Sequence, residues 1–471
     1  MSSRKQFLQD YVKAIRNGNA AIFAGAGLSR PSGFVVWKEL LRPLVDNIGL
    51  NIDQEHDLTA VAQYVRNQNG NRYSINSNLL EAYCRDVEVN ENVSIITRLP
   101  IYTYWTTNYD KLIEDGLRNA NRNPDVKIES KQLPNTKRDR DAIVYKMHGD
   151  IEHVADAVLT KDDYIKYDKK YPFFKNVLQS DLISKTFLFI GFSFEDPNLD
   201  NILSQIKLLM DENVRDHYCF MKRVSKDAFE NDECYGYEKA RQDLREKDLS
   251  RYGIQTIFVD DYNEITEILR NLEESVLSNN IFISGSIEYY DEIWTKERIE
   301  ELTYKLSNQL VKKEFKITSG FGLGIGSSVI NGALDEIYKS KYKQIIEHLC
   351  LRPFPQGIMN PEERKEKWNK YREDIIGDNG IVIFIAGNKN HNDNQCIADG
   401  CLQEFKIAKN EKRIIIPVGC TGNAAECIYN EVKENINEYP YLKPYINDLK
   451  DETNIDKIVQ IIIDICEENR W

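Results

Sequence analysis

The sequence predicts an α/β protein made of two Rossmann-like domains, each with a parallel sheet packed between helices. Short apolar runs such as Ala20–Ala24 alternate with amphipathic helical stretches along the whole chain. Glycine-rich turns follow two of the expected strands, at 25–27 and at 320–326. Because the strand, turn and helix pattern restarts after the middle of the chain, we expect a first domain over residues 1–275 and a second over residues 276–471.

The composition excludes several classes of function. A chain of 471 residues with 41% hydrophobic and 29% charged residues can form more than one hydrophobic core. The formal net charge of −13 argues against a nucleic-acid partner, because binding to a phosphate backbone relies on clustered Lys and Arg. The longest apolar runs fall well short of the ~20 residues of a membrane span, and no apolar leader is seen. We therefore expect a cytoplasmic protein without a membrane partner.

The nine cysteines form no pair of Cys-x-x-Cys knuckles. The closest spacings, 396/401 and 420/427, lack the further partners of a zinc ribbon. We expect reduced thiols and no bound metal.

The stretch Ala20–Ser29 predicts a buried strand that ends in a sharp turn through Gly25 and Gly27. Backbone N–H groups exposed by such a turn can bind the pyrophosphate of a dinucleotide. An ordinary glycine-rich connection between strand and helix explains the same residues equally well, because a short glycine pattern is a weak signal. The ends of the other strands must decide between the two interpretations.

Three further strands of the first half end in residues that suit a ligand site. Asn108 and Asp110 follow an aromatic and β-branched run, although Asp110 could equally well cap the next helix. His148 follows the next apolar run, where a general base would be exposed, although a lone histidine is more often structural. Gly191 and Ser193 follow the most apolar strand of this half.

Two neighbouring stretches have structural interpretations. Asp196 and Pro197 predict the N-cap and the first residue of a helix. Residues 50–100 have helical periodicity with Asn-rich and Gly-rich breaks, which predicts a helical insertion in the first domain.

The glycine-rich turn of the second half has four glycines within residues 320–326, between an expected strand and an expected helix. Ordering a glycine costs ~1 kcal/mol more in conformational entropy than ordering other residues. We therefore favour close approach of the backbone to a phosphate over a flexible loop.

In order and spacing, the stretches 25–29, 107–110, 148–150 and 191–193 resemble the motifs of the sirtuin-like NAD-binding fold. The resemblance implies that Asn108 and His148 are catalytic, with His148 as the base. It also assigns NAD binding to residues in or next to three of these stretches: Ala24, Gly25, Ala26, Gly27, Ser29, Asp110, Gly191, Phe192 and Ser193.

The chain departs from the protein-deacylating sirtuins in two ways. Arg30-Pro31-Ser32-Gly33 follows Ser29 in place of their Asp-Phe-Arg motif, and their zinc-binding cysteine quartet is absent. Deacylation of an acyl-lysine peptide is therefore the less favoured activity. The favoured one is cleavage of the nicotinamide–ribose bond, with NAD as substrate, water as acceptor and no metal. His148 would activate a ribose hydroxyl or the water as an oxocarbenium-like centre develops.

The second half resembles the SLOG superfamily, whose members bind nucleotides or nucleotide-derived signals. It lacks the Pro-Gly-Gly-x-Gly-Thr signature of SLOG phosphoribohydrolases. This absence favours a ligand-sensing role for the second half over an enzymatic one. Taken singly, Arg372 and Glu404 could each be a solvated helix charge. The resemblance nevertheless assigns a ligand pocket to Gly285, Ser286, Gly320, Phe321, Gly322, Leu323, Gly324, Gly326, Arg372, Lys389 and Glu404.

A sirtuin-like domain followed by a SLOG domain resembles the effector family of Thoeris antiphage systems. That resemblance implies a TIR-domain partner whose cyclic ADP-ribose isomer binds the second domain and switches on NAD destruction, leading to abortive infection. We also expect a homo-tetramer or a higher assembly, because coupling across a symmetric assembly sharpens a switch. The alternative from another class is a catalytically silent nucleotide sensor or scaffold in which His148 only packs.

Overall fold

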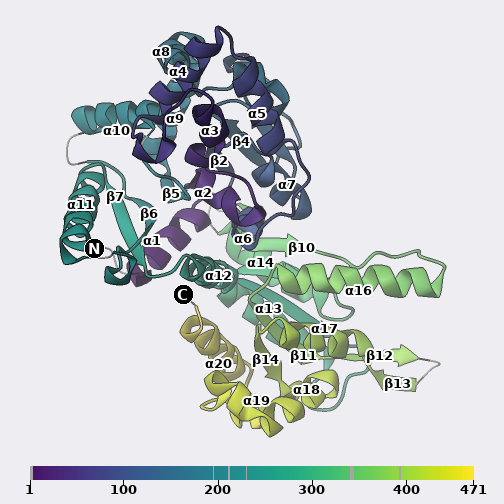
Figure 1. Cartoon of the computed structure of the whole chain (residues 1–471). Helices are drawn as coiled ribbons and strands as arrows, with labels where there is room; N and C mark the ends of the chain where they lie inside the picture. The colour runs from purple at the N-terminus through teal and green to yellow at the C-terminus, as the bar shows by residue number, and fades with distance from the viewer. Residues whose placement is uncertain are drawn as a thin grey trace. The chain divides into compact units, whose positions relative to one another are not determined.

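The computed structural model describes residues 4–470 except 195, 211–212, 230, 340–343 and 392–393. The chain divides into two compact units, Met1–Glu273 and Glu274–Trp471. Each unit contains one large sheet with all of its strands parallel (Figure 1). The α/β class and the two parallel-sheet domains expected from the sequence are confirmed.

The first sheet has seven strands in the order β3-β4-β2-β1-β5-β6-β7. Its central strand β1 pairs with β2 on one side and β5 on the other, and all five of its residues are buried. The strands are β1 (Ala20–Ala24), β2 (Thr103–Thr106), β3 (Pro124–Lys127), β4 (Ala142–Lys146), β5 (Thr186–Ile190), β6 (His217–Lys222) and β7 (Ile254–Val259).

Helices connect these strands, and three of them, α4, α5 and α6, form the expected helical insertion between β1 and β2. Aromatic side chains from β1 and β5 fill the core, with the Phe23 and Phe189 ring centroids 5.2 Å apart. The helices of this unit are α1 (Arg4–Arg16), α2 (Ala26–Ser29), α3 (Trp37–Asp46), α4 (Leu58–Asn69), α5 (Tyr73–Tyr83), α6 (Glu91–Arg98), α7 (Leu112–Asn119), α8 (Lys161–Lys170), α9 (Pro172–Ser184), α10 (Pro197–Met210), α11 (Asp232–Arg251) and α12 (Asn263–Leu277), which runs past the boundary.

The second sheet has five strands in the order β10-β9-β8-β11-β14, and a separate hairpin pairs β12 with β13. The strands are β8 (Asn280–Ser286), β9 (Lys316–Ser319), β10 (Leu349–Leu351), β11 (Ile381–Ala386), β12 (Asn388–His391), β13 (Asn394–Ile397) and β14 (Ile414–Val418). The helices are α13 (Lys296–Lys312), α14 (Gly326–Tyr338), α15 (Ile345–His348), α16 (Pro361–Gly377), α17 (Asp399–Asn410), α18 (Asn423–Glu434), α19 (Asp448–Asp451) and α20 (Ile455–Glu468).

Within the described ranges, no helix is both long enough and apolar enough to cross a bilayer. No group of three or more His, Cys, Asp or Glu side chains among the same residues is arranged to hold a metal ion. All nine cysteines are free thiols.

Candidate active site

A cleft of about 1630 Å³ opens in the first unit. It is lined by the residues that directly follow β1, β2 and β4 and by the ends of β5 and β6. Since these strands are parallel, all of these ends lie at the carboxyl edge of the sheet, where open α/β folds bind ligands. The four motif stretches found in the sequence therefore meet at one place.

Asn108 is held rigidly at this edge. Its Nδ2 donates to the Gly25 carbonyl at 3.0 Å and to Ser29 Oγ at 2.9 Å. Ser29 in turn donates to Asp110 Oδ2 at 2.7 Å, while Asp110 Oδ1 accepts from the Leu112 amide at 3.0 Å. Because Nδ2 is committed to the β1 turn, the side-chain oxygen of Asn108 is the atom left for a substrate or a water.

Asp110 therefore has both roles that the sequence allowed: it supports the site through Ser29, and it binds the first turn of α7. Burial raises its pKa, and this effect outweighs the opposing effects of Lys146 and the Ser29 hydrogen bond. Asp110 lines the cleft, yet both of its carboxylate oxygens accept hydrogen bonds from the protein.

Beneath this edge lies Lys146, the last residue of β4, which is completely buried. Its ammonium group contacts the Asp150 carboxylate, Glu114 Oε1 at 3.1 Å and the Asp110 carbonyl at 2.5 Å. Burial alone would lower its pKa, but the surrounding carboxylates raise it, so the lysine stays charged. Lys146 thereby ties the end of β4 to the turn that holds Asp110.

His148 lines the cleft and is almost completely buried. Its Nε2 lies 2.9 Å from Asp196 Oδ2, which also accepts from the Tyr164 hydroxyl at 2.9 Å. The Trp37 ring packs beside the imidazole, with 6.1 Å between ring centroids. The imidazole is thus held by a carboxylate on one side and by aromatic rings on others.

The glycine-rich turn at 25–27 contacts Gly191, which explains why these positions are glycines. A Cβ on Gly25 would lie 2.5 Å from the Gly191 carbonyl oxygen, and one on Gly191 would lie 2.1 Å from the Leu28 nitrogen. Gly191 also has φ +64°, which side chains rarely adopt. The Gly27 amide donates to the Gly191 carbonyl at 2.8 Å, so that amide is occupied within the protein.

Most of the residues expected to bind NAD or to act in catalysis line the cleft, whereas Ala24 and Gly25 do not. Those on the wall are Ala26, Gly27, Ser29, Asn108, Asp110, His148, Gly191, Phe192 and Ser193.

Sequence reasoning missed three side chains of this site: Asp196, Tyr164 and Lys146. Asp196 is the expected N-cap of α10, since its Oδ1 accepts from the Leu199 amide at 3.0 Å, but its other oxygen binds His148. A lysine two residues before His148 in an otherwise apolar run was the available signal for Lys146. Nothing in the sequence pointed to Tyr164.

In the second unit, one polar cluster joins β8, α16 and α17. Ser284 Oγ donates to Glu404 Oε2 at 2.6 Å, and Arg372 Nε lies 3.4 Å from Glu404 Oε1. The Arg372 guanidinium also stacks on Phe354 and Trp368, 5.1 and 5.8 Å from their centroids. Neither Arg372 nor Glu404 is a solvated helix charge, because both are buried.

Close packing accounts for most of the glycines of the second motif. A Cβ on Gly322 would lie 1.9 Å from the Gly285 carbonyl oxygen, and one on Gly324 would lie 2.2 Å from the Ile287 carbonyl oxygen. Gly326 is similarly confined by Phe321, whereas Gly320 has room for a side chain. The loop thus folds tightly onto the end of β8, and the Phe321 and Leu323 side chains are exposed.

The remaining residues assigned to the ligand pocket lie around the carboxyl end of the same sheet. Ser286 Oγ donates to the Asn388 carbonyl at 3.0 Å. Lys389, on β12, forms an ion pair with Asp399 at the start of α17.

Two family models match the chain. Residues 102–257 match a SIR2-like domain, and residues 264–469 match the Sir2- and TIR-associating SLOG family. The fold and these matches define a protein with a sirtuin-like domain followed by a SLOG domain.

Three relatives refine this class. The chain is 44% identical to the NAD(+) hydrolase ThsA of Bacillus cereus (strain MSX-D12) over 98% of its own length and 97% of that protein. It is 43% identical to the NAD(+) hydrolase ThsA of Cytobacillus dafuensis, over 98% of the chain and 96% of the relative. It is 24% identical to defense-associated sirtuin 2 of Bacillus subtilis, over 61% of the chain and 28% of that relative.

Identity of this extent over nearly the whole chain shows the family: the chain belongs to the ThsA NAD(+) hydrolases. It is an enzyme, and NAD is its substrate. The expected family and the expected NAD hydrolysis are confirmed.

Proposed function

We propose that this NAD hydrolase is a signal-activated glycohydrolase that cleaves NAD to nicotinamide and ADP-ribose, with His148 as general base and Asn108 orienting the reactants. The observation that carries the proposal is their position on one cleft at the carboxyl edge of the first sheet. Asn108 is fixed there by hydrogen bonds and His148 by its close contact with the Asp196 carboxylate, as preorganised catalysis requires.

In the proposed reaction the bond between nicotinamide nitrogen and ribose C1′ breaks, and the bonding electrons leave with nicotinamide. Water then forms a bond to C1′, and His148 takes the proton that the water loses. Asn108 would hold the attacking water or a ribose hydroxyl through its side-chain oxygen. General acid–base groups of this kind typically contribute ~10²–10⁴-fold to the rate.

The second unit would bind the activating signal, a cyclic ADP-ribose isomer made by a TIR-domain protein. The support is a set of buried or paired charges around Arg372, Glu404 and Lys389, which an anionic ligand could engage. A pyrophosphate needs such local cations in a protein with a net charge of −13. The description of the matched family as Sir2- and TIR-associating points to the same kind of partner.

The biological role we propose is antiphage defence by abortive infection, in which the activated enzyme depletes cytoplasmic NAD. Such an enzyme must be silent at rest. A switch from ~1% to ~99% active requires about 5.5 kcal/mol of differential ligand binding between the two states. We propose a homo-tetramer or a higher assembly as the form in which that energy is coupled between domains.

The test is to mix the purified full chain with NAD, with and without a panel of cyclic ADP-ribose isomers, and to measure nicotinamide release. We expect turnover to rise strongly with one isomer. Binding of an isomer without any turnover would support a silent sensor instead. Turnover that no isomer changes would remove the signal from the proposal, and light scattering of the same samples would test the assembly.

A further inference from the structure

The pairing of His148 with Asp196 constrains where the proton of the imidazole lies. An ionised carboxylate can only accept hydrogen bonds, so the ring nitrogen that faces it must carry a hydrogen. That nitrogen is Nε2, 2.9 Å from Asp196 Oδ2. In the neutral ring the lone pair then lies on Nδ1, which is buried and has no hydrogen-bond partner among the described residues.

We propose that Asp196 is a positioning residue that fixes the catalytic tautomer of His148, so that Nδ1 is the basic atom of the site. This inference rests on the assignment of His148 as the base in the proposed function. The carboxylate also stabilises the imidazolium that forms when Nδ1 takes up a proton, since Nε2 lies only 2.9 Å from Asp196 Oδ2.

The surroundings keep Asp196 in the required charge state. Burial would raise its pKa, but His148 and hydrogen bonds from the Leu199 amide and Tyr164 lower it overall. Three tyrosines interact with Asp196: Tyr164 and Tyr167 from α8, and Tyr109 from the turn after β2. Burial and, next, neighbouring groups raise the pKa of all three, so they stay neutral near pH 7.

Capping of α10 does not explain why this residue is an aspartate. The cap uses only Oδ1, through the Leu199 amide, and Asn or Ser would cap a helix about as well. Only a carboxylate supplies a second, charged acceptor oxygen to Nε2. Tyr164 donates to that same oxygen at 2.9 Å, and its hydroxyl lies 3.4 Å from Nε2, so the tyrosine contacts both members of the pair.

The experiment compares Asp196→Asn with the wild-type full chain in the nicotinamide-release assay, with and without the same panel of cyclic ADP-ribose isomers. The asparagine keeps the cap but offers an amide to Nε2, which favours the opposite tautomer. We expect kcat to fall about 10²-fold or more with KM changed less than about threefold. Tyr164→Phe should reduce kcat by less, about 5–10-fold. If Asp196→Asn does not fold, Asp196→Ser takes its place in the comparison.

Asp261→Asn is the matched control, because Asp261 caps α12 through the Asn263 amide at 2.9 Å and does not line the cleft. A purely structural role would lower the thermal midpoint of Asp196→Asn but leave kcat per folded enzyme near that of the control.

A second readout is independent of turnover. Nitrogen-15 spectra of histidine-labelled full chain, with His148→Ala to assign its signals, report which ring nitrogen carries the hydrogen. We expect a protonated Nε2 and a bare Nδ1 in the wild type, and loss of that pattern in Asp196→Asn. A wild-type ring with hydrogen on Nδ1, or wild-type kcat in Asp196→Asn, would overturn the inference. Full turnover in His148→Ala would instead overturn the proposed base itself.

Discussion

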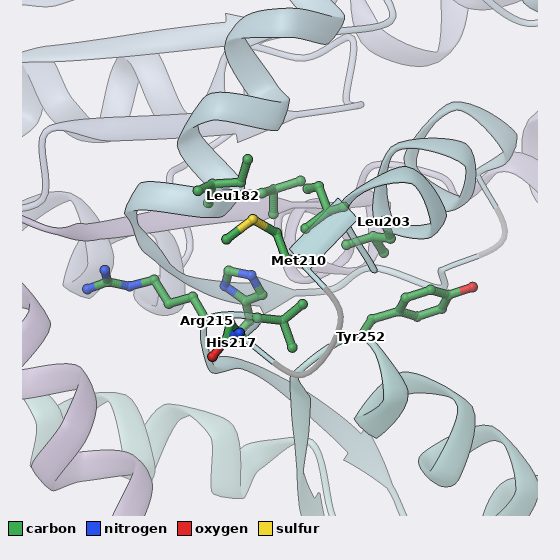
Figure 2. A pocket seen from close by; sticks show the side chains of 10 residues that line it. Leu182, Leu203, Met210, Arg215, His217 and Tyr252 are labelled. Carbon is green, nitrogen blue, oxygen red and sulfur yellow. The ribbon is translucent and has the colours of Figure 1, made fainter. Parts of the chain in front are cut away.

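Two buried histidines of the first unit differ in almost everything except their burial. His148 follows the carboxyl end of β4 and lines the cleft, whereas His217 is the first residue of β6. Figure 2 shows the His217 ring beneath Met210, in a small pocket whose other walls include Leu182 and Leu203. The Arg215 guanidinium extends away from the ring in the same view.

Their hydrogen-bond partners give the rings different roles. His217 Nδ1 accepts from the Phe187 amide at 3.1 Å, so this nitrogen is committed to holding β5 beside β6. Burial, together with the charge of Arg215, lowers the pKa of His217 to about 3. His148 Nε2 instead lies 2.9 Å from the Asp196 carboxylate. Both rings are buried, so burial does not distinguish a reactive histidine from a structural one. The distinguishing features are the position at the carboxyl or amino end of a strand and the group that the ring contacts.

Among the variants outside the two histidines, Asn108→Ala should give the largest loss of NAD turnover, because Asn108 lies at the same carboxyl edge of the sheet as His148. We expect a loss of ~10²-fold or more in NAD turnover per folded molecule, beyond any loss of stability from the two hydrogen bonds removed. Asn119→Ala, at an exposed site at the end of α7, is the control and should retain full activity. A loss below tenfold in nicotinamide release would exclude Asn108 from the chemistry.

Lys146→Met tests the support beneath the cleft. Removing the ammonium leaves the Glu114 and Asp150 carboxylates buried without their partner, which typically costs about 3–5 kcal/mol of unfolding free energy. Lys170→Met, in the half-exposed ion pair with Asp156, should cost less than about 1 kcal/mol. Chemical denaturation of both variants measures the difference, and equal midpoints would contradict the role given to Lys146.

We expect His217 to make the free energy of unfolding depend on pH without affecting NAD turnover. Its folded pKa lies below the unfolded value, so acid protonates the unfolded chain first, and stability falls as pH drops from about 6.5 toward about 3. Between pH 7 and pH 5 this amounts to about 2 kcal/mol, which His217→Gln should lack. Denaturation midpoints of both proteins at the two pH values give the comparison, and parallel pH dependence would refute it.

Arg372→Ala extends the contrast to the second unit, where a buried cation again faces a carboxylate. We expect the activation midpoint for the effective cyclic ADP-ribose isomer to rise about tenfold or more, because a charge-assisted contact is lost. Arg364→Ala, an exposed residue on the same helix, is the control. An unchanged midpoint in Arg372→Ala would remove this residue from the pocket.

Much of the fold was predictable because apolar runs and glycine turns follow the local chemistry of strands. The helical insertion between β1 and β2 and the N-cap at Asp196 were both predicted from such local patterns. Strand β3 was missed because Pro and Asp disfavour strands, although an edge strand tolerates them. The hairpin of β12 and β13 was missed because its residues are polar.

The site was predictable only as far as it follows strand ends. The apolar run before each residue predicts that Asn108 and His148 lie at strand ends. Asp196 contacts His148 only because the fold brings distant segments together. The glycines of 320–326 suggested a phosphate, but their close packing against β8 is a tertiary effect that no local pattern reveals.

The most direct test of the central claim is nicotinamide release from NAD by His148→Ala and His217→Gln, measured side by side on folded full-length protein under activating conditions. We expect His148→Ala to lose ~10²–10⁴-fold in turnover per folded molecule, whatever the change in its thermal midpoint. His217→Gln should lose stability and keep its turnover per folded molecule. Full turnover in His148→Ala, or a loss of turnover in both variants of similar size, would contradict the account.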